Sequence, residues 1–141
     1  MKRLLLPFLI CITLGLLACQ AKAEQPPVGD PLTGTWVGSF GNGSWDQNTI
    51  SLELKWDGKN LTGTVKPGNP SGSMYRSFTP FNIEKASYDP STNTIKFNAL
   101  FSPRDRTYIV TGKVTRDAIT GTWDRPDERR NGDFKLTRQK S

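Results

Sequence analysis

The sequence predicts an all-β protein, an eight-stranded antiparallel up-and-down barrel, with a β-sandwich as the alternative. Apolar and polar residues alternate along eight stretches, as in strands that pack one face against an interior. A pattern of apolar-Thr-Gly-x-apolar occurs four times and puts glycine on the apolar face, where a strand bends or a large side chain needs room. Closure into a barrel buries every apolar face and removes exposed edges, which favours it over the sandwich. The four copies begin at Leu32, Leu61, Val110 and Ile119.

The first half of the chain contains four of the predicted strands. Residues 33–40 carry the first copy of the pattern, and residues 60–66 carry the second. Between them, residues 48–57 alternate isoleucine, leucine and tryptophan with serine, glutamate and lysine, which is one of the clearest strand patterns in the chain. Residues 79–88 form the fourth predicted strand, with an aromatic residue in apolar register.

The second half repeats this organisation. Residues 94–101 alternate isoleucine, phenylalanine and alanine with lysine and asparagine. Residues 107–115 and 118–124 contain the third and fourth copies of the pattern, and residues 133–139 form the last predicted strand. Since no stretch has helical periodicity, we expect a protein built from strands.

The connections between strands differ in length, and this difference predicts two unlike ends. Tight turns at residues 57–59, 89–93 and 116–117 have the residue types of short hairpins. In an up-and-down meander, alternate connections lie at opposite ends, so all the tight turns fall at one end and all the long connections at the other. We call these the closed end and the mouth. The long connections cover residues 41–47, 67–78, 102–106 and 125–132.

The N-terminus has the features of an export signal. Residues 1–23 begin with basic residues, followed by an apolar core shorter than the roughly 20 residues of a membrane-spanning helix. The residues up to Cys19 resemble the lipobox of bacterial lipoproteins, so we expect cleavage before Cys19 and its lipidation; cleavage after Ala23 is the alternative. Residues 24–31 are proline-rich and predict a flexible tether, which leaves residues 32–141 as one barrel domain. We therefore expect an exported protein, periplasmic or anchored in the outer membrane, with secretion as the alternative.

The net charge and the cysteine content argue against a nucleic-acid-binding protein and against a disulfide-stabilised one. The net charge of +6 includes three basic residues of the signal, and residues 24–141 hold 16 basic and 13 acidic residues, a net charge of +3. This excess is too small to predict nucleic-acid binding. Cys11 leaves with the signal, so no disulfide forms within the mature chain.

The residue types of most catalytic sites are missing. The chain has no histidine, which excludes Ser-His-Asp triads and histidine-ligated zinc. We expect no enzyme activity, no cofactor and no metal. Acidic and basic residues are interleaved around the seventh connection, which we interpret as a solvated, self-paired loop rather than an acid/base pair or a calcium site. They are Asp124, Arg125, Asp127, Glu128, Arg129, Arg130 and Asp133.

Two positions give the chain a resemblance to the calycin superfamily, which includes lipocalins, fatty-acid-binding proteins and avidins. Gly34, Thr35 and Trp36 match the Gly-x-Trp on the first strand of lipocalins, and Arg138 lies in the last strand, where lipocalins place an arginine against that tryptophan. The resemblance implies that Trp36 and Arg138 plug the closed end, with the guanidinium stacked over the ring and bonded to strand-end carbonyls.

The first and second copies of the repeated pattern also look like the first strands of avidins. The biotin-binding residues of avidins do not carry over, because Gly38, Val65 and Pro67 stand where avidins have asparagine, tyrosine and serine. Biotin is therefore not the expected ligand.

The long connections predict a modestly positive mouth that bears aromatic side chains. Arginines lie in these connections, and the acidic residues near them offset part of their charge. Such a mouth suits an anionic amphiphile such as a fatty acid, or an acidic partner, better than a cation. The residues that we expect to line it are Trp45, Tyr75, Arg76, Arg104 and Arg106.

Two functions stay open at this point. The first is an exported, lipocalin-like binding protein that holds a small apolar or amphipathic ligand at the barrel mouth. The second is an envelope-tethered interaction module or inhibitor, whose interior is filled by side chains and whose partner is an envelope protein. In either case contact with the membrane is through the lipid anchor alone.

Overall fold

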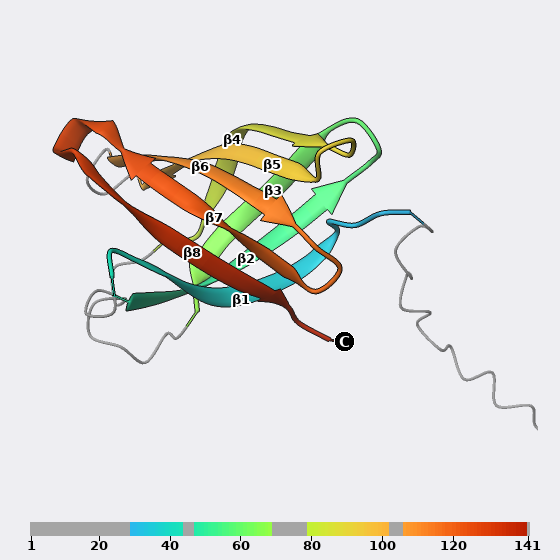
Figure 1. The fold of residues 1–141 in the computed structure, drawn as a ribbon, viewed down its shortest axis with the longest axis horizontal. Coiled ribbons are helices and arrows are strands. Elements are labelled where there is room, and N and C mark those ends of the chain that lie inside the picture. The colour runs from blue at the N-terminus through green and yellow to red at the C-terminus, as the bar shows by residue number, and fades with distance from the viewer. Residues whose placement is uncertain (1–28, 44–46, 69–78, 102–105, 141) are drawn as a thin grey trace, which may run out of the picture.

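The computed structural model describes residues 29–43, 47–68, 79–101 and 106–140 (Figure 1). Eight antiparallel strands follow one another around a closed barrel, with β1 hydrogen-bonded to β8. The predicted barrel is confirmed, and the sandwich is excluded. The strands are β1 (Gly34–Gly41), β2 (Gln47–Trp56), β3 (Leu61–Pro67), β4 (Phe81–Asp89), β5 (Thr94–Phe101), β6 (Arg106–Val114), β7 (Ala118–Arg125) and β8 (Arg130–Arg138).

The seventh connection is shorter than predicted. We expected a long loop over residues 125–132, but β7 includes Arg125 and β8 begins at Arg130. A single 3-10 turn, η3 (Pro126–Glu128), joins the two strands. Proline begins this turn, and Arg129 ends it in the left-handed region, with φ of 50°. The sequence prediction was wrong here because proline and a run of charges are typical of both a loop and a tight hairpin turn.

The two ends of the barrel differ as the meander requires. The turns that join β2 to β3, β4 to β5 and β6 to β7 lie on the right in Figure 1, where the C-terminus also lies. The β7–η3–β8 turn lies at the opposite end, on the left. The closed end and the mouth are therefore separated by the length of the strands.

The interior is packed with hydrophobic side chains from every strand. Glycines on the inner face make room for one of the largest of them. A Cβ atom at Gly121 would lie 2.1 Å from the carbonyl oxygen of Thr111 and 2.9 Å from the ring of Phe134, and a Cβ at Gly112 would lie 2.8 Å from the same ring. Gly112 and Gly121 are paired across β6 and β7. These two glycines of the repeated pattern thus accommodate Phe134 from β8.

Trp36 and Arg138 lie against each other at the closed end. The indole of Trp36 is 0% exposed, and its Nε1 donates a hydrogen bond to the carbonyl of Leu32 at 2.8 Å. The guanidinium carbon of Arg138 lies 4.2 Å from the centroid of the Trp36 ring. Its Nη1 donates to the carbonyl of Thr33 at 2.7 Å, and its Nη2 donates to that of Pro31. The last strand is therefore fastened to the segment that precedes the first.

The wall of the barrel is least continuous between β3 and β4. These strands are paired only at Thr64 with Asn82 and at Val65 with Phe81, whereas every other neighbouring pair matches over five to eight positions. The register of β4 shifts around Lys85, which has a φ of 48°. This shift lies in the pairing of β4 with β5, and a β-bulge of this kind bends the strand that carries it. We call this part of the wall the β3–β4 seam.

Candidate ligand-binding site at the barrel mouth

The alternation of β7 carries a charged side chain into the barrel. Ile119 and Trp123 face the interior and are buried, and the same period of two places Arg125 on the inner face at the mouth. On β6 the inward-facing positions toward the mouth are Tyr108 and Arg106. The inner face at the mouth therefore holds two arginines and a phenol from adjacent strands.

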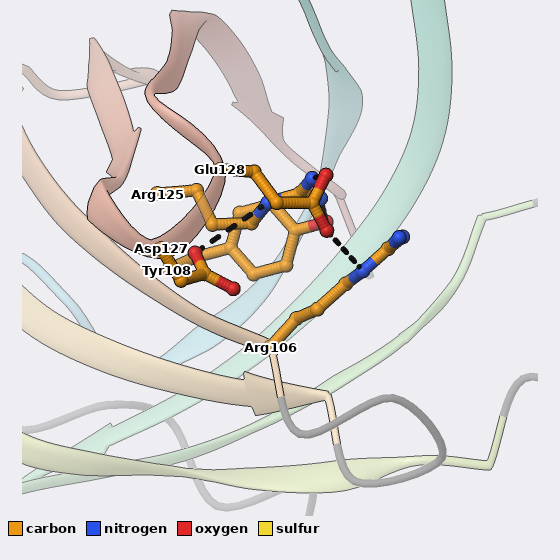
Figure 2. Close-up of polar contacts among 5 residues, drawn as sticks. All are labelled: Arg106, Tyr108, Arg125, Asp127 and Glu128. Atoms are coloured by element: carbon orange, nitrogen blue, oxygen red, sulfur yellow. Dashed lines mark hydrogen bonds and ion pairs between the residues drawn. The ribbon is translucent and has the colours of Figure 1, made fainter.

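Arg125 is the charged residue most deeply buried among those described, with 2% of its surface exposed. Its Nη1 donates a hydrogen bond to the hydroxyl of Tyr108 at 3.2 Å, and its guanidinium carbon lies 5.5 Å from the centroid of the Tyr108 ring. Figure 2 shows the two side chains in contact. A guanidinium buried to this extent must be paired with an anion, because leaving it unpaired costs several kcal/mol.

Two carboxylates from η3 face this guanidinium (Figure 2). Glu128 contacts Nη2 of Arg125 through Oε2, and its Oε1 lies 2.9 Å from Nε of Arg106. Oδ1 of Asp127 lies 3.8 Å from Nε of Arg125. One carboxylate therefore bridges both arginines, and a second lies further away.

Some buried N–H groups of the site have no hydrogen-bond partner among the described residues. Nε and Nη2 of Arg125 have ionic partners but no hydrogen bond of acceptable geometry with any described residue. Nε1 of Trp123, the preceding inward-facing residue of β7, is also buried without a partner among them. Buried donors are nearly always satisfied in proteins, by the chain, by water or by a ligand. Among the described residues, Nε of Arg125 and Nε1 of Trp123 therefore lack an acceptor at hydrogen-bond distance.

Aromatic side chains form the floor and part of the wall of the site. Phe40, Tyr108 and Trp123 contact one another edge to face, with ring centroids 5.5 to 6.3 Å apart. Phe81 and Phe101 make a similar contact at 6.2 Å, and both are only partly buried. The mouth thus combines cationic groups with accessible apolar surface.

The predicted mouth residues are only partly covered by the structure. Arg106 lies in the site and pairs with Glu128. Trp45, Tyr75, Arg76 and Arg104 lie outside the described residues, as does Cys19.

Sequence reasoning missed three residues of the site. Arg125 and Glu128 were assigned to a solvated, self-paired loop, and Tyr108 was not among the predicted mouth residues. The self-pairing was predicted correctly, but Arg125 is buried rather than solvated. The sequence did contain a signal for the burial of Arg125. The alternate residues of β7 that face the interior end with Trp123, and the next residue in this alternation is Arg125.

Two other features bear on the chemistry of the described part of the chain. Within it, no group of three or more acidic residues or other ligand types is placed to hold a metal ion. A helix long and apolar enough to cross a membrane is likewise not found there.

Comparisons with known proteins agree with the fold. A solved structure described as a redesigned beta barrel matches with a TM-score of 0.58 and 10% sequence identity, over 78% of this chain and 92% of that one. At this identity the likeness shows a small β-barrel and nothing of function. Neither the protein-family models nor the curated proteins that were searched match this chain. The resemblance to calycins stays a prediction.

Proposed function

We propose that this chain is an exported, lipocalin-like binding protein whose barrel mouth holds the anionic head of a small amphiphile. The observation that carries the proposal is the burial of Arg125 inside the mouth, where its guanidinium is paired with the carboxylate of Glu128 and its Nε lacks a hydrogen bond to a described residue. Charge-assisted bonds from a guanidinium to a planar carboxylate are among the strongest polar contacts in proteins. A ligand carboxylate would bind the guanidinium groups that the Glu128 carboxylate pairs with in this structure.

The apolar surface beside the arginines suits the remainder of such a ligand. Phe40 and Tyr108 are partly buried against the core, and Phe81 and Phe101, at the same end of the barrel, are partly buried as well. Binding sites for small molecules commonly combine an apolar lining with a few polar groups that fix orientation. An alkyl chain attached to the carboxylate would cover this surface.

The proposal is tested by titrating tryptophan fluorescence with dodecanoate and with dodecylammonium. Trp123 reports on the mouth because its ring centroid lies 5.5 Å from that of Tyr108. We expect saturable binding of the carboxylate and none of the ammonium compound. Equal responses to both, or no response to either, would contradict the anion preference.

A pair of arginine variants locates the binding. Arg106→Gln removes a partly buried guanidinium of the site, and we expect it to weaken dodecanoate binding about tenfold or more, the effect of losing a hydrogen bond to a charged group. Arg129→Gln is the matched control. It changes the net charge by the same amount, but at an exposed position at the end of the η3 turn. Equal weakening in both variants would indicate a diffuse charge effect.

Export and anchoring are part of the proposal. We propose lipidation at Cys19, with cleavage after Ala23 as the alternative. Cys19→Ser should move the protein from the membrane fraction to the soluble fraction. If the variant and the parent are both soluble, the lipid anchor is wrong.

The packing of the barrel favours a second candidate, an envelope-tethered interaction module. Phe40, Trp123 and Phe134 fill the interior below Arg125. A barrel filled in this way would present its mouth as a surface for an acidic segment of a partner protein. Absence of dodecanoate binding together with recovery of one specific envelope protein after cross-linking would favour this function.

A further inference from the structure

Glu128 occupies the place that a ligand carboxylate would take in the proposed function. Its two oxygens are divided between two arginines, one facing Nη2 of Arg125 and the other lying 2.9 Å from Nε of Arg106. Asp127 reaches Arg125 only at 3.8 Å and is paired with no other arginine among the described residues. The carboxylate of Glu128 is therefore the one that a second carboxylate would have to replace.

The turn that carries Glu128 is held by the paired ends of β7 and β8, where Arg125 pairs with Arg130, and its own side chains add charged contacts to the mouth. None of the η3 residues is buried, and no side chain caps the turn at its start. The side chain of Glu128 is 36% exposed, so it can leave the arginines without disturbing the hydrophobic core. A backbone hydrogen bond from Arg129 to Pro126, at 3.3 Å, keeps the turn itself intact.

We propose that Glu128 is an internal competitor: its carboxylate closes the empty site by pairing with Arg125 and Arg106, and an incoming carboxylate displaces it into solvent. The inference rests on the proposed function and adds its regulation. Charge is conserved in the exchange, because one carboxylate replaces another on the same guanidinium groups. Arg125 therefore keeps an anionic partner with the site empty and with it occupied, which avoids the cost of an unpaired buried charge.

While Glu128 occupies the site, a ligand cannot bind there. The apparent affinity for the ligand is therefore the intrinsic affinity multiplied by the fraction of molecules in which Glu128 has left the arginines. Removing the competitor should therefore tighten ligand binding, although it also removes a favourable contact from the empty protein. The two effects have opposite signs, and a purely structural salt bridge would produce only the loss of stability.

The test compares three proteins: the wild type, Glu128→Gln and Asp124→Asn. Asp124 precedes Arg125 on the outer face of β7 and is exposed, so Asp124→Asn makes the same change of net charge outside the barrel. We expect Glu128→Gln to bind dodecanoate about tenfold more tightly than the wild type, and Asp124→Asn to bind it as the wild type does.

A second measurement, of the unfolding temperature with and without dodecanoate, distinguishes weaker binding by Glu128→Gln from a loss of its stability. Its unfolding temperature should be lower than that of the wild type without ligand, and dodecanoate should raise it by more than it raises that of the wild type. A variant that folds only in the presence of dodecanoate would give the same support, whereas one that dodecanoate fails to restore would overturn the inference.

The outcomes separate this inference from the proposed function. If the wild type binds dodecanoate but Glu128→Gln binds it no more tightly than Asp124→Asn does, Glu128 is a structural partner of Arg125 and the inference is wrong. If none of the three proteins binds dodecanoate, the proposed function fails, and the inference fails with it.

Discussion

Two arginines inside this barrel have opposite hydrogen-bonding states. Arg138 stacks on Trp36 and donates from all three nitrogens to backbone carbonyls, including that of Arg116. Arg125 is more deeply buried, yet among the described residues it makes one well-formed hydrogen bond, to Tyr108. An arginine bonded to backbone carbonyls stabilises the fold, whereas one paired with the carboxylate of an exposed turn can exchange that partner, as the proposed function requires.

The plug at the closed end gives a prediction for a single residue. Trp36→Ala removes a fully buried indole together with its contact to Arg138, and should lower the free energy of unfolding by roughly 3–5 kcal/mol. Urea denaturation of the variant beside the wild type measures this change. A loss well under about 1 kcal/mol would show that Trp36 is not a buried part of the core.

The contact between Trp36 and Arg138 at the closed end was predicted more accurately from the sequence than the arrangement of side chains at the mouth. Trp36 and Arg138 were paired from a family resemblance and from the matching ends of the meander, and the structure places them in contact. Arg125 was assigned to solvent because its burial depends partly on Tyr108, which comes from a different strand, β6. The pairing with nearby Glu128 could be predicted from the local charges, but the contact with Tyr108 could not.

Among the elements, two of the three tight turns at the closed end are fixed by aspartate side chains. Asp57 accepts hydrogen bonds from the backbone and side chain of Asn60, and these lower its pKa to about 2. Asp89 accepts bonds from the hydroxyls of Ser91 and Thr92, which likewise lower its pKa to about 2. Both turns therefore depend on ionised carboxylates.

These lowered pKa values predict how stability changes with acid. A carboxylate whose pKa is lower in the folded state contributes stability that is present above its unfolded pKa, near 3.8, and is lost as the pH falls through about 2. The double variant Asp57→Asn/Asp89→Asn should be less stable than the wild type at pH 5, and this difference should shrink toward pH 2. Urea midpoints measured across this range test it, and a difference independent of pH would contradict it.

The β3–β4 seam predicts where the barrel opens first. With two paired positions, these strands are matched over fewer residues than the other neighbouring strands that the structure describes, and so offer fewer places for ladder hydrogen bonds. Local opening is easiest where such bonds are few. In native-state hydrogen exchange, amides of β3 and β4 that point into the seam should exchange faster than those between β6 and β7. Uniform protection around the barrel would exclude a weak seam.

Eight strands and their order followed from the period-two alternation, because a closed meander buries every apolar face in one core. Their bounds were less exact, since β8 begins at Arg130 rather than at residue 133. The conformations of the long connections cannot be derived from alternation, because their sequences have no periodic pattern.

At the scale of the whole molecule, the chain enters the barrel at the end opposite the buried arginine. Gly29 and Pro31 lie beside Arg138 around one hollow at the closed end. Arg125 and η3 lie at the other end. If Cys19 carries a lipid, as we propose, the tether joins the barrel at the end away from the mouth.

The most direct test of the central claim observes the arginine guanidinium groups themselves by NMR while dodecanoate is added. The account predicts that the Nε–H resonances of Arg125 and Arg106 shift with saturation, because both exchange one carboxylate for another. The resonance of Arg138, bonded to carbonyls at the closed end, should stay in place and serves as the internal control. Binding of dodecanoate that leaves Arg125 and Arg106 unshifted would contradict the assignment of the mouth as an anion site.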